Sequence, residues 1–366
     1  AEAKAAAEAK AAAEAKAAAD KAAAEAAAAA AKVPPKSLLD RMREEQQSEN
    51  PQPKKNQAKD QKSEEVIPVL LHENMLKKHS CVLLWSGRKQ FTLKQKARNQ
   101  NWVCTSFSSG KKELRTLGRR RLGKRSKRSA DRNQDLIGIQ TTKNSKINRV
   151  FVFDGVSESL RPREWAEALL LSALEMRITI AKLKNQKTLN KWHSKALTLW
   201  SKWKEEEYET NRERKADWME TRNRQDAHTT LTLFEPNTPK ENVAVVGDSP
   251  FFAFSSSTNK SFMFPPEFDH AEGPDTIGTP KAPSPDDFSF VNVDCADYDV
   301  LIACTDSIGD YLHENFSNQN KCLDFLRHCK QKDWRNYLDQ QLTLGRAAGG
   351  LKDDDISLFM MESVPR

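Results

Sequence analysis

The chain has 366 residues and a formal net charge of +8, with 30% charged and 38% hydrophobic residues. Its composition is uneven, because residues 1–32 are almost entirely Ala, Glu and Lys, and residues 33–66 are rich in Pro, Gln, Lys and Ser. Neither stretch holds enough apolar residues to build a core, so one large domain is expected in the remainder of the chain.

The sequence gives no sign of a membrane span, a signal peptide, a disulfide framework or a structural zinc site. No apolar stretch reaches the roughly 18 residues that a membrane span needs, and no signal peptide is visible. The six cysteines include no Cys-x-x-Cys pair and no histidine at zinc-finger spacing. This spacing argues against a disulfide framework or a structural zinc site and favours a reducing compartment, so we expect a cytoplasmic protein.

The N-terminal part of the chain is predicted to lie outside the domain. Residues 1–32 repeat with a period of six and are strongly helix-forming, but this period does not return to one face of a helix. We therefore predict a solvated helix there, followed by a flexible linker at residues 33–66. Residues 67–100 give a mixed signal and stay unassigned, as a candidate N-terminal extension.

The domain itself is expected to span residues 101–366 and to begin with a basic loop. Lys and Arg crowd together in residues 111–132 with Gly, Ser and almost no aromatic residues. Surfaces that bind single-stranded nucleic acid interleave aromatic side chains, so we interpret this run as a solvated loop and do not expect nucleic acid as a partner. Contact with an acidic partner or a phosphate backbone is the alternative.

A long helical segment is predicted at residues 161–227. Trp192, Trp200 and Trp203 fall on one face of it, which we interpret as packing against a sheet, with a binding surface as the alternative. A second helical region is predicted at residues 319–344. Short β-like runs separated by turns surround these segments, and the order of elements suits an α+β fold with helices stacked on antiparallel sheets.

Four aspartates lie far apart in the sequence, each where a strand-like run meets a turn. They are Asp135, Asp154, Asp306 and Asp354. A sheet that brings these carboxylates to one edge would offer oxygen ligands, which suit magnesium or manganese and phosphoryl chemistry. The alternative is that each aspartate is only a turn residue at a strand end.

Six short motifs in these turns resemble, in their order, the metal-dependent protein serine/threonine phosphatases of type 2C, and the bacterial branch most of all. The motifs are Asn133-Gln134-Asp135, Asp154-Gly155-Val156, His228-Thr229-Thr230, Gly247-Asp248-Ser249, Thr305-Asp306 and Asp353-Asp354-Asp355. The resemblance covers about Trp102 to Ser363. It implies two antiparallel β-sheets sandwiched between helices, with two magnesium or manganese ions at one end.

The resemblance also implies a role for each candidate site residue. Asp154 would bridge both ions, and the backbone carbonyl of Gly155 would bind one of them. Asp306 and Asp354 would be further ligands of one ion, while Asp135 would act near the other ion, mostly through water. Asp135 and Asp154 are therefore the candidate catalytic residues.

The implied function is hydrolysis of phosphoserine or phosphothreonine on a protein partner, by a water that the two ions activate. Such an enzyme would act in signalling as a phosphoric monoester hydrolase. The sequence does not define the oligomeric state or the physiological phosphoprotein.

A second interpretation stays open, because the chain departs from the family at several positions. Val156 stands where many members have a histidine that can donate a proton to the leaving group, and Gln134 stands where a glutamate is common. Ala130 occupies the position of the usual phosphate-binding arginine, and Ser307 that of a usual glycine. The alternative is thus a catalytically weak or inactive pseudophosphatase that binds phosphoproteins. Retention of all the carboxylates favours the enzyme, since burying them together without metal is costly.

Overall fold

The computed structural model describes residues 69–84, 90–97, 100–109, 133–156, 159, 162–210, 226–266 and 275–364. The chain divides into two compact units, Ala1–Glu65 and Val66–Arg366, and every described residue belongs to the second unit. The predicted Ala-rich helix, the linker up to residue 65 and the basic loop at residues 111–132 all lie outside the described residues.

The first of two large sheets is antiparallel throughout. Its strands, in spatial order, are β1 (Cys81–Leu84), β4 (Leu136–Thr141), β5 (Ile147–Phe153), β7 (Leu231–Phe234), β8 (Val243–Val246) and β12 (Ser289–Val291). All four residues of β7 and of β8 are buried, as expected for strands covered on both faces.

The second sheet is also antiparallel and packs face to face against the first. Its strands, in spatial order, are β10 (Lys260–Phe264), β9 (Phe251–Ser255), β13 (Val300–Cys304), β14 (Ile356–Val364), β3 (Gln100–Ser109) and β2 (Phe91–Ala97). The core between the sheets holds aromatic contacts such as Phe234 with Phe251, whose ring centroids are 4.9 Å apart. Two short strands, β6 (His228–Thr229) and β11 (Ile277–Gly278), form a separate pair.

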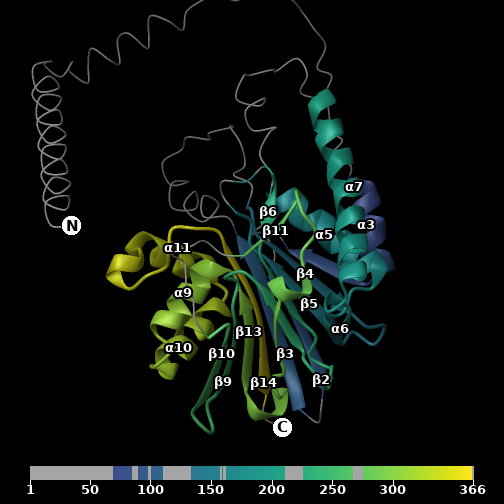
Figure 1. Ribbon diagram of the computed structural model, residues 1–366. Helices are drawn as coiled ribbons and strands as arrows, with labels where there is room; N and C mark the ends of the chain where they lie inside the picture. The colour runs from purple at the N-terminus through teal and green to yellow at the C-terminus, as the bar shows by residue number, and fades with distance from the viewer. Residues whose placement is uncertain are drawn as a thin grey trace, which may run out of the picture. The chain divides into compact units, whose positions relative to one another are not determined.

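Helices cover the outer face of each sheet (Figure 1). On the first sheet lie α3 (Val69–Lys78), α5 (Pro162–Met176), α6 (Ile180–Leu183) and α7 (Gln186–Thr210). On the second lie α9 (Asp306–Glu314), α10 (Gln319–Cys329) and α11 (Trp334–Leu344). Short 3₁₀ turns occur at Pro285–Asp287, Cys295–Asp297 and Arg346–Ala348. The predicted α+β fold, two antiparallel sheets between helices, is therefore confirmed.

The tryptophans of the long helical segment pack inside the protein. Trp192 is fully buried, and its indole N–H donates to the carbonyl of Leu169 at 2.9 Å. Trp200 meets the ring of Trp165 edge to face at 6.3 Å. For Trp192 and Trp200, the interpretation as core packing is confirmed, and the alternative of a binding surface is wrong. The side chain of Trp203 lies outside the described residues.

Two features of the fold were not predicted from the sequence. Strand β1 pairs with β4 and strand β2 with β3, so much of residues 67–100 belongs to the two sheets. Both are edge strands with partly exposed side chains; β1 has only four residues, all apolar, and β2 mixes apolar and polar residues. The helical region predicted at residues 319–344 is two helices, because α10 ends at Cys329 and α11 begins at Trp334.

Two further observations concern the cysteines and the apolar character of the helices. All six cysteines are buried, and none of them forms a disulfide. None of the described helices combines the length and the apolar character that crossing a bilayer requires.

Candidate functional site

Strand register places Asp135 and Asp154 side by side. Asp135 directly precedes β4 and Asp154 directly follows β5, and these two strands pair antiparallel with Leu136 opposite Phe153. Residues just outside a paired position at the same end of two neighbouring strands are themselves neighbours. The two aspartates therefore lie at one end of the first sheet.

The same geometry places Asp306 and Asp354 at an end of the second sheet. Cys304, the last residue of β13, pairs with Leu358 near the start of β14. Asp306 begins helix α9 two residues after β13, and Asp354 lies two residues before Ile356, the first residue of β14.

Three hydrogen bonds join these two strand ends across the sandwich. The Thr305 hydroxyl donates to Asp135 at 2.9 Å, and the backbone N–H of Asp306 donates to the Asp154 carboxylate at 3.2 Å. The backbone N–H of Gln134 donates to the carboxylate of Asp355 at 2.7 Å. The loops that carry the aspartates of the two sheets are thus in direct contact, and the structure brings all four predicted aspartates to one region.

Asp135 is almost completely buried, with 1% of its surface exposed. Burial raises the pKa of its carboxyl well above the usual value, and the charges of Asp355, Asp306 and Asp354 raise that pKa further. The hydrogen bond from Thr305 acts in the opposite direction. A buried carboxyl surrounded by other carboxylates is poorly stabilised as an anion unless a cation is near.

The pKa of the Asp154 carboxyl is affected in a similar way. Burial raises the pKa of its carboxyl strongly, and the charges of Asp135, Asp306 and Asp248 add to the rise. The backbone N–H of Asp306 partly offsets them. Asp248 lies in the turn between β8 and β9, which carries the chain from the first sheet to the second. Asp248 is not among the predicted site residues, but its carboxylate contributes to the field at the site.

Lys352 supplies positive charge to this cluster. Its ammonium donates a hydrogen bond to Asp306 and lies 3.9 Å from a carboxylate oxygen of Asp354. Burial lowers the pKa of Lys352, but the contact with Asp306 and the charges of Asp354 and Asp310 outweigh this effect and raise it. Lys352 therefore carries its proton at neutral pH.

Gly155 occupies a position that a side chain would not fit. A Cβ there would lie 2.7 Å from the carbonyl oxygen of Gln134 and 2.9 Å from Pro162. Gly155 also forms an isolated bridge with Thr229, whose hydrogen bonds run through the carbonyl of Asp154 and the N–H of Val156. In such a bridge, the carbonyl of Gly155 itself points away from the strand that carries Thr229.

Several residues of this region were not predicted as site residues. Asp355 is buried, and its carboxylate accepts a hydrogen bond from the backbone N–H of Gln134. A run of three aspartates has no periodicity from which to predict which of them faces inward. Lys352 is also new, because a lysine beside an acidic run normally indicates a solvated surface. The positions of Arg128, Ala130 and Arg132 lie outside the described residues.

The donor chemistry of this end of the sandwich fits a hard cation. Its candidate ligands are carboxylate and carbonyl oxygens, which magnesium and manganese prefer. Burial, and after it the charges of neighbouring carboxylates, raise the pKa of Asp135 and of Asp154, and a divalent ion would offset both effects. Across the part of the chain that the structure describes, no three His, Cys, Asp or Glu side chains already surround a common point as a preformed metal site. Asp306 is turned toward Lys352 instead.

Comparisons with known proteins give matches among solved structures. No family model matches the sequence, and no curated protein matches it. The serine/threonine phosphatase Stp1 from Staphylococcus aureus is 17% identical over 77% of this chain and 100% of its own, with a TM-score of 0.39. The catalytic domain of the serine threonine protein phosphatase PstP, in complex with two manganese ions, is 11% identical over 78% of this chain and 100% of its own, with a TM-score of 0.35.

A third match is the photosystem II phosphatase PBCP, which is 11% identical over 71% of this chain and 98% of its own, with a TM-score of 0.41. Because these identities and TM-scores are low, the fold of this chain is established by its own strand pairing, described above, and not by these matches.

Proposed function

We propose that this chain is a metal-dependent phosphatase that hydrolyses phosphoserine or phosphothreonine on a protein partner. The observation that carries this proposal is the pair of buried Asp135 and partly buried Asp154, held by hydrogen bonds against the loops that bear Asp306 and Asp355. So many carboxylates in one buried place are unfavourable for folding alone, so a ligand of positive charge is their simplest explanation.

Two sets of residues would hold magnesium or manganese. Asp154, the carbonyl of Gly155 and Asp135 would serve one ion, and Asp154 with Asp306 and Asp354 would serve the other. When bound, such an ion lowers the pKa of a coordinated water and neutralises the charge that develops on the phosphoryl oxygens. The chain's own contribution is to fix these oxygens in place, through Thr305 on Asp135 and the backbone N–H of Asp306 on Asp154.

The cysteines do not suit the alternative of thiol-based phosphatase chemistry. Cys304 lies closest to the site, but burial raises the pKa of its thiol well above the usual value, and the charges of Asp306, Asp310 and Asp154 add to the effect. A nucleophilic cysteine needs the reverse, an electropositive surrounding that lowers the pKa of the thiol.

The test is hydrolysis of a small aryl phosphate in manganese by the purified full chain. We expect Asp154→Asn to lower turnover at least about 100-fold, since even outer-shell partners of metal ligands reach that cost. The matched control is Asp297→Asn, because Asp297 is an exposed carboxylate paired with Lys260 at 3.4 Å. Equal activity of Asp154→Asn and wild type, or activity that persists in chelator, would contradict the proposal.

A pseudophosphatase is the second candidate, and two observations favour it. Val156 offers no proton to a leaving group, and Lys352 occupies one side of the carboxylate cluster. In this case the protein would bind manganese and a phosphopeptide without turning the peptide over. Turnover that is lost in Asp154→Asn would rule this candidate out.

A further inference from the structure

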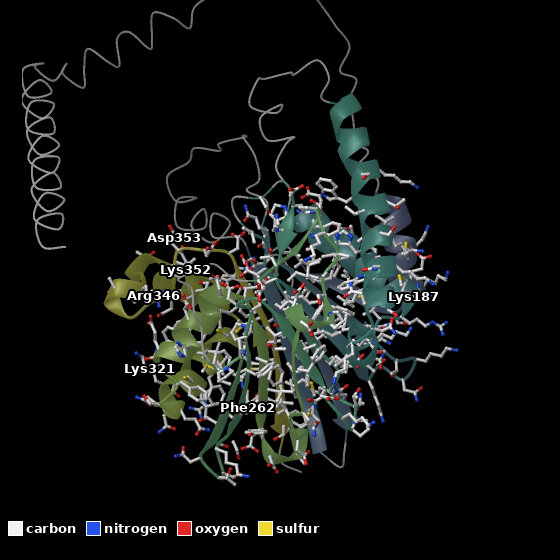
Figure 2. The ribbon with its side chains drawn as sticks, viewed as in Figure 1. Lys187, Phe262, Lys321, Arg346, Lys352 and Asp353 are labelled. Atoms are coloured by element: carbon white, nitrogen blue, oxygen red, sulfur yellow. The ribbon has the colours of Figure 1, made fainter. Side chains whose placement is uncertain are left out.

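Lys352 is built into the carboxylate cluster rather than placed loosely beside it. It lies on the segment that leads into β14, and its side chain is 40% exposed, while that of Asp306 is 11% exposed. Figure 2 shows Lys352 near Arg346 at one end of the molecule, with Phe262 toward the other end. Its ammonium contacts the same two carboxylates, Asp306 and Asp354, that are assigned above to one metal position.

A second observation explains why Lys352 stays there. The hydroxyl of Ser307 donates to the backbone carbonyl of Lys352 at 3.0 Å, and Ser307 is fully buried. Ser307 replaces the glycine that is usual after the aspartate of this motif. A glycine has no hydroxyl to offer, so this contact with Lys352 depends on Ser307. Ser307 holds the backbone of Lys352 against the start of α9, and the lysine side chain then reaches Asp306.

The neighbouring cation has other partners. Arg346 lies 3.0 Å from Asp310 and 2.5 Å from Glu314. Lys352 thus balances Asp306 and Asp354, while Arg346 balances the next carboxylates along α9.

We propose that the ammonium of Lys352 replaces one of the two divalent ions, so that this chain binds a single magnesium or manganese ion, on the side of Asp135, Asp154 and Gly155. This inference rests on the proposed function. A divalent ion bound by Asp306 and Asp354 would lie beside a fixed ammonium, and like charges at such a short distance repel strongly in a partly buried site. The lysine and a second ion therefore exclude each other.

The experiment counts bound manganese on the full chain by electron paramagnetic resonance, from the loss of the free-ion signal during titration. We expect one bound ion in the wild type and two in Lys352→Met, which keeps the length of the side chain and removes its charge. The matched control, Lys260→Met, removes an exposed lysine that pairs with Asp297, and it should bind one ion like the wild type. Circular dichroism of each variant confirms that it is folded.

The outcomes separate this inference from the proposed function. Two ions in the wild type, or one ion in both the wild type and Lys352→Met, overturn the role of Lys352 and leave the phosphatase proposal standing. No ion in the wild type but one in Lys352→Met supports the role of Lys352 and overturns metal-dependent activity of the natural chain. No ion in either overturns both. If Lys352→Met does not fold, the wild-type count decides, since two ions there contradict the inference and one supports it.

Discussion

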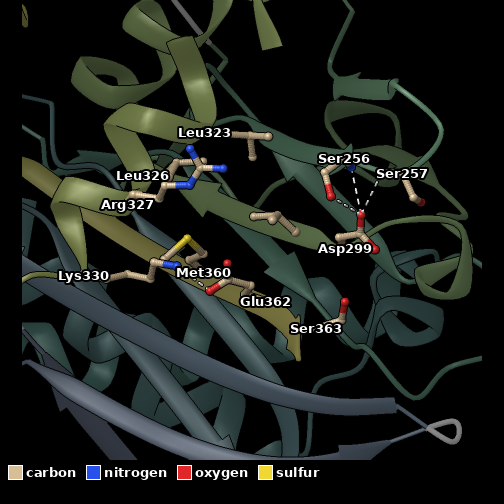
Figure 3. A pocket seen from close by; sticks show the side chains of 11 residues that line it. Ser256, Ser257, Asp299, Leu323, Leu326, Arg327, Lys330, Met360, Glu362 and Ser363 are labelled. Atoms are coloured by element: carbon tan, nitrogen blue, oxygen red, sulfur yellow. Dashed lines mark hydrogen bonds and ion pairs between the residues drawn. The ribbon is translucent and has the colours of Figure 1, made fainter. Parts of the chain in front are cut away.

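The two ends of strands β13 and β14 carry similar acidic residues in opposite settings. Asp306 follows β13, whereas Asp299 precedes it. The Asp299 carboxylate accepts hydrogen bonds from the N–H and the hydroxyl of Ser256, both at 2.8 Å, and from the N–H of Ser257 at 3.4 Å (Figure 3). Every one of these donors comes from the turn between β9 and β10, so Asp299 caps a turn and is fully accounted for by the fold.

The rest of that end is balanced in the same way. Glu362, near the end of β14, pairs with Lys330 at 2.5 Å, and both residues line a cavity of about 380 Å³ that also contains Asp299. At the opposite end, among the residues that the structure describes, the carboxylates around Asp154 outnumber the cations beside them. The difference teaches that an excess of buried like charge, rather than the presence of aspartate or of a cavity, distinguishes the candidate site.

A buried carboxylate of the first sheet gives the largest test of this comparison. Glu235 is buried after β7, and its charge is matched by Arg149, 3.2 Å away. Removing the arginine in Arg149→Met should make this position resemble the candidate site, with an unpaired buried carboxylate. We expect a loss of about 3 kcal/mol in unfolding free energy at pH 7, measured by urea denaturation.

The loss should depend on pH in a defined direction. Burial already raises the pKa of Glu235 in the folded state, and Arg149 is the first of the groups that lower it again. Without Arg149 this pKa rises further, so the penalty is absent below the unfolded pKa of about 4.5 and grows as pH increases toward the folded pKa. The control is Lys195→Met, which breaks an exposed pair with Glu175 and should show little change. A penalty that is the same at pH 4 and pH 8 would contradict this account.

Gly155 tests how tightly the site end is packed. Gly155→Ala places a methyl group 2.7 Å from a backbone carbonyl, which cannot move without shifting Gln134 and the loop before Asp135. We expect a loss of about 2 kcal/mol in unfolding free energy and weaker manganese binding. In Gly138→Ala, the new methyl meets the side chain of Leu170 and no backbone atom, so the loss should be smaller, at about 1 kcal/mol. Equal losses would show that the site end is no more constrained than the middle of β4.

Two hydroxyls that donate to aspartates at opposite ends give the smallest contrast. Thr305 bonds Asp135 and also accepts the N–H of Ser357 at 3.0 Å, so Thr305→Val leaves two buried groups without this partner. We expect a loss of about 1.5 kcal/mol in the free energy of unfolding, measured by thermal or urea denaturation. Ser256→Ala removes an exposed hydroxyl from Asp299, which keeps its backbone donors, and should cost about 0.5 kcal/mol or less. The comparison of the two ends fails if Ser256→Ala costs more.

Much of the architecture was predictable because it depends on patterns that act locally. Apolar runs such as Val150–Phe153 predicted strands. Aspartates at the ends of these runs predicted a shared edge, because the end of one antiparallel strand lies beside the start of its neighbour. The two edge strands β1 and β2 were not predictable for different reasons. Strand β1 is a run of only four apolar residues, which does not distinguish a strand from a buried helix segment, and β2 mixes apolar residues with Lys, Gln and Thr.

The site was less predictable than the fold, because its details depend on contacts between distant segments. Nothing near Asp248 in the sequence indicates that its charge reaches Asp154. The pairing of Lys352 with Asp306 spans 46 residues, and only the packing of α9 against the segment before β14 brings them together. Metal-ligand roles for Asp135, Asp154, Gly155, Asp306 and Asp354 stay predictions that the experiments above test.

The most direct test of a cation at the carboxylate end is anomalous diffraction from crystals of the full chain grown with manganese. The account predicts an anomalous peak between the carboxylates of Asp135 and Asp154, and no peak at Asp299 or Glu362. A peak only at the Asp299 end, or none beside Asp154 at saturating manganese, would contradict it.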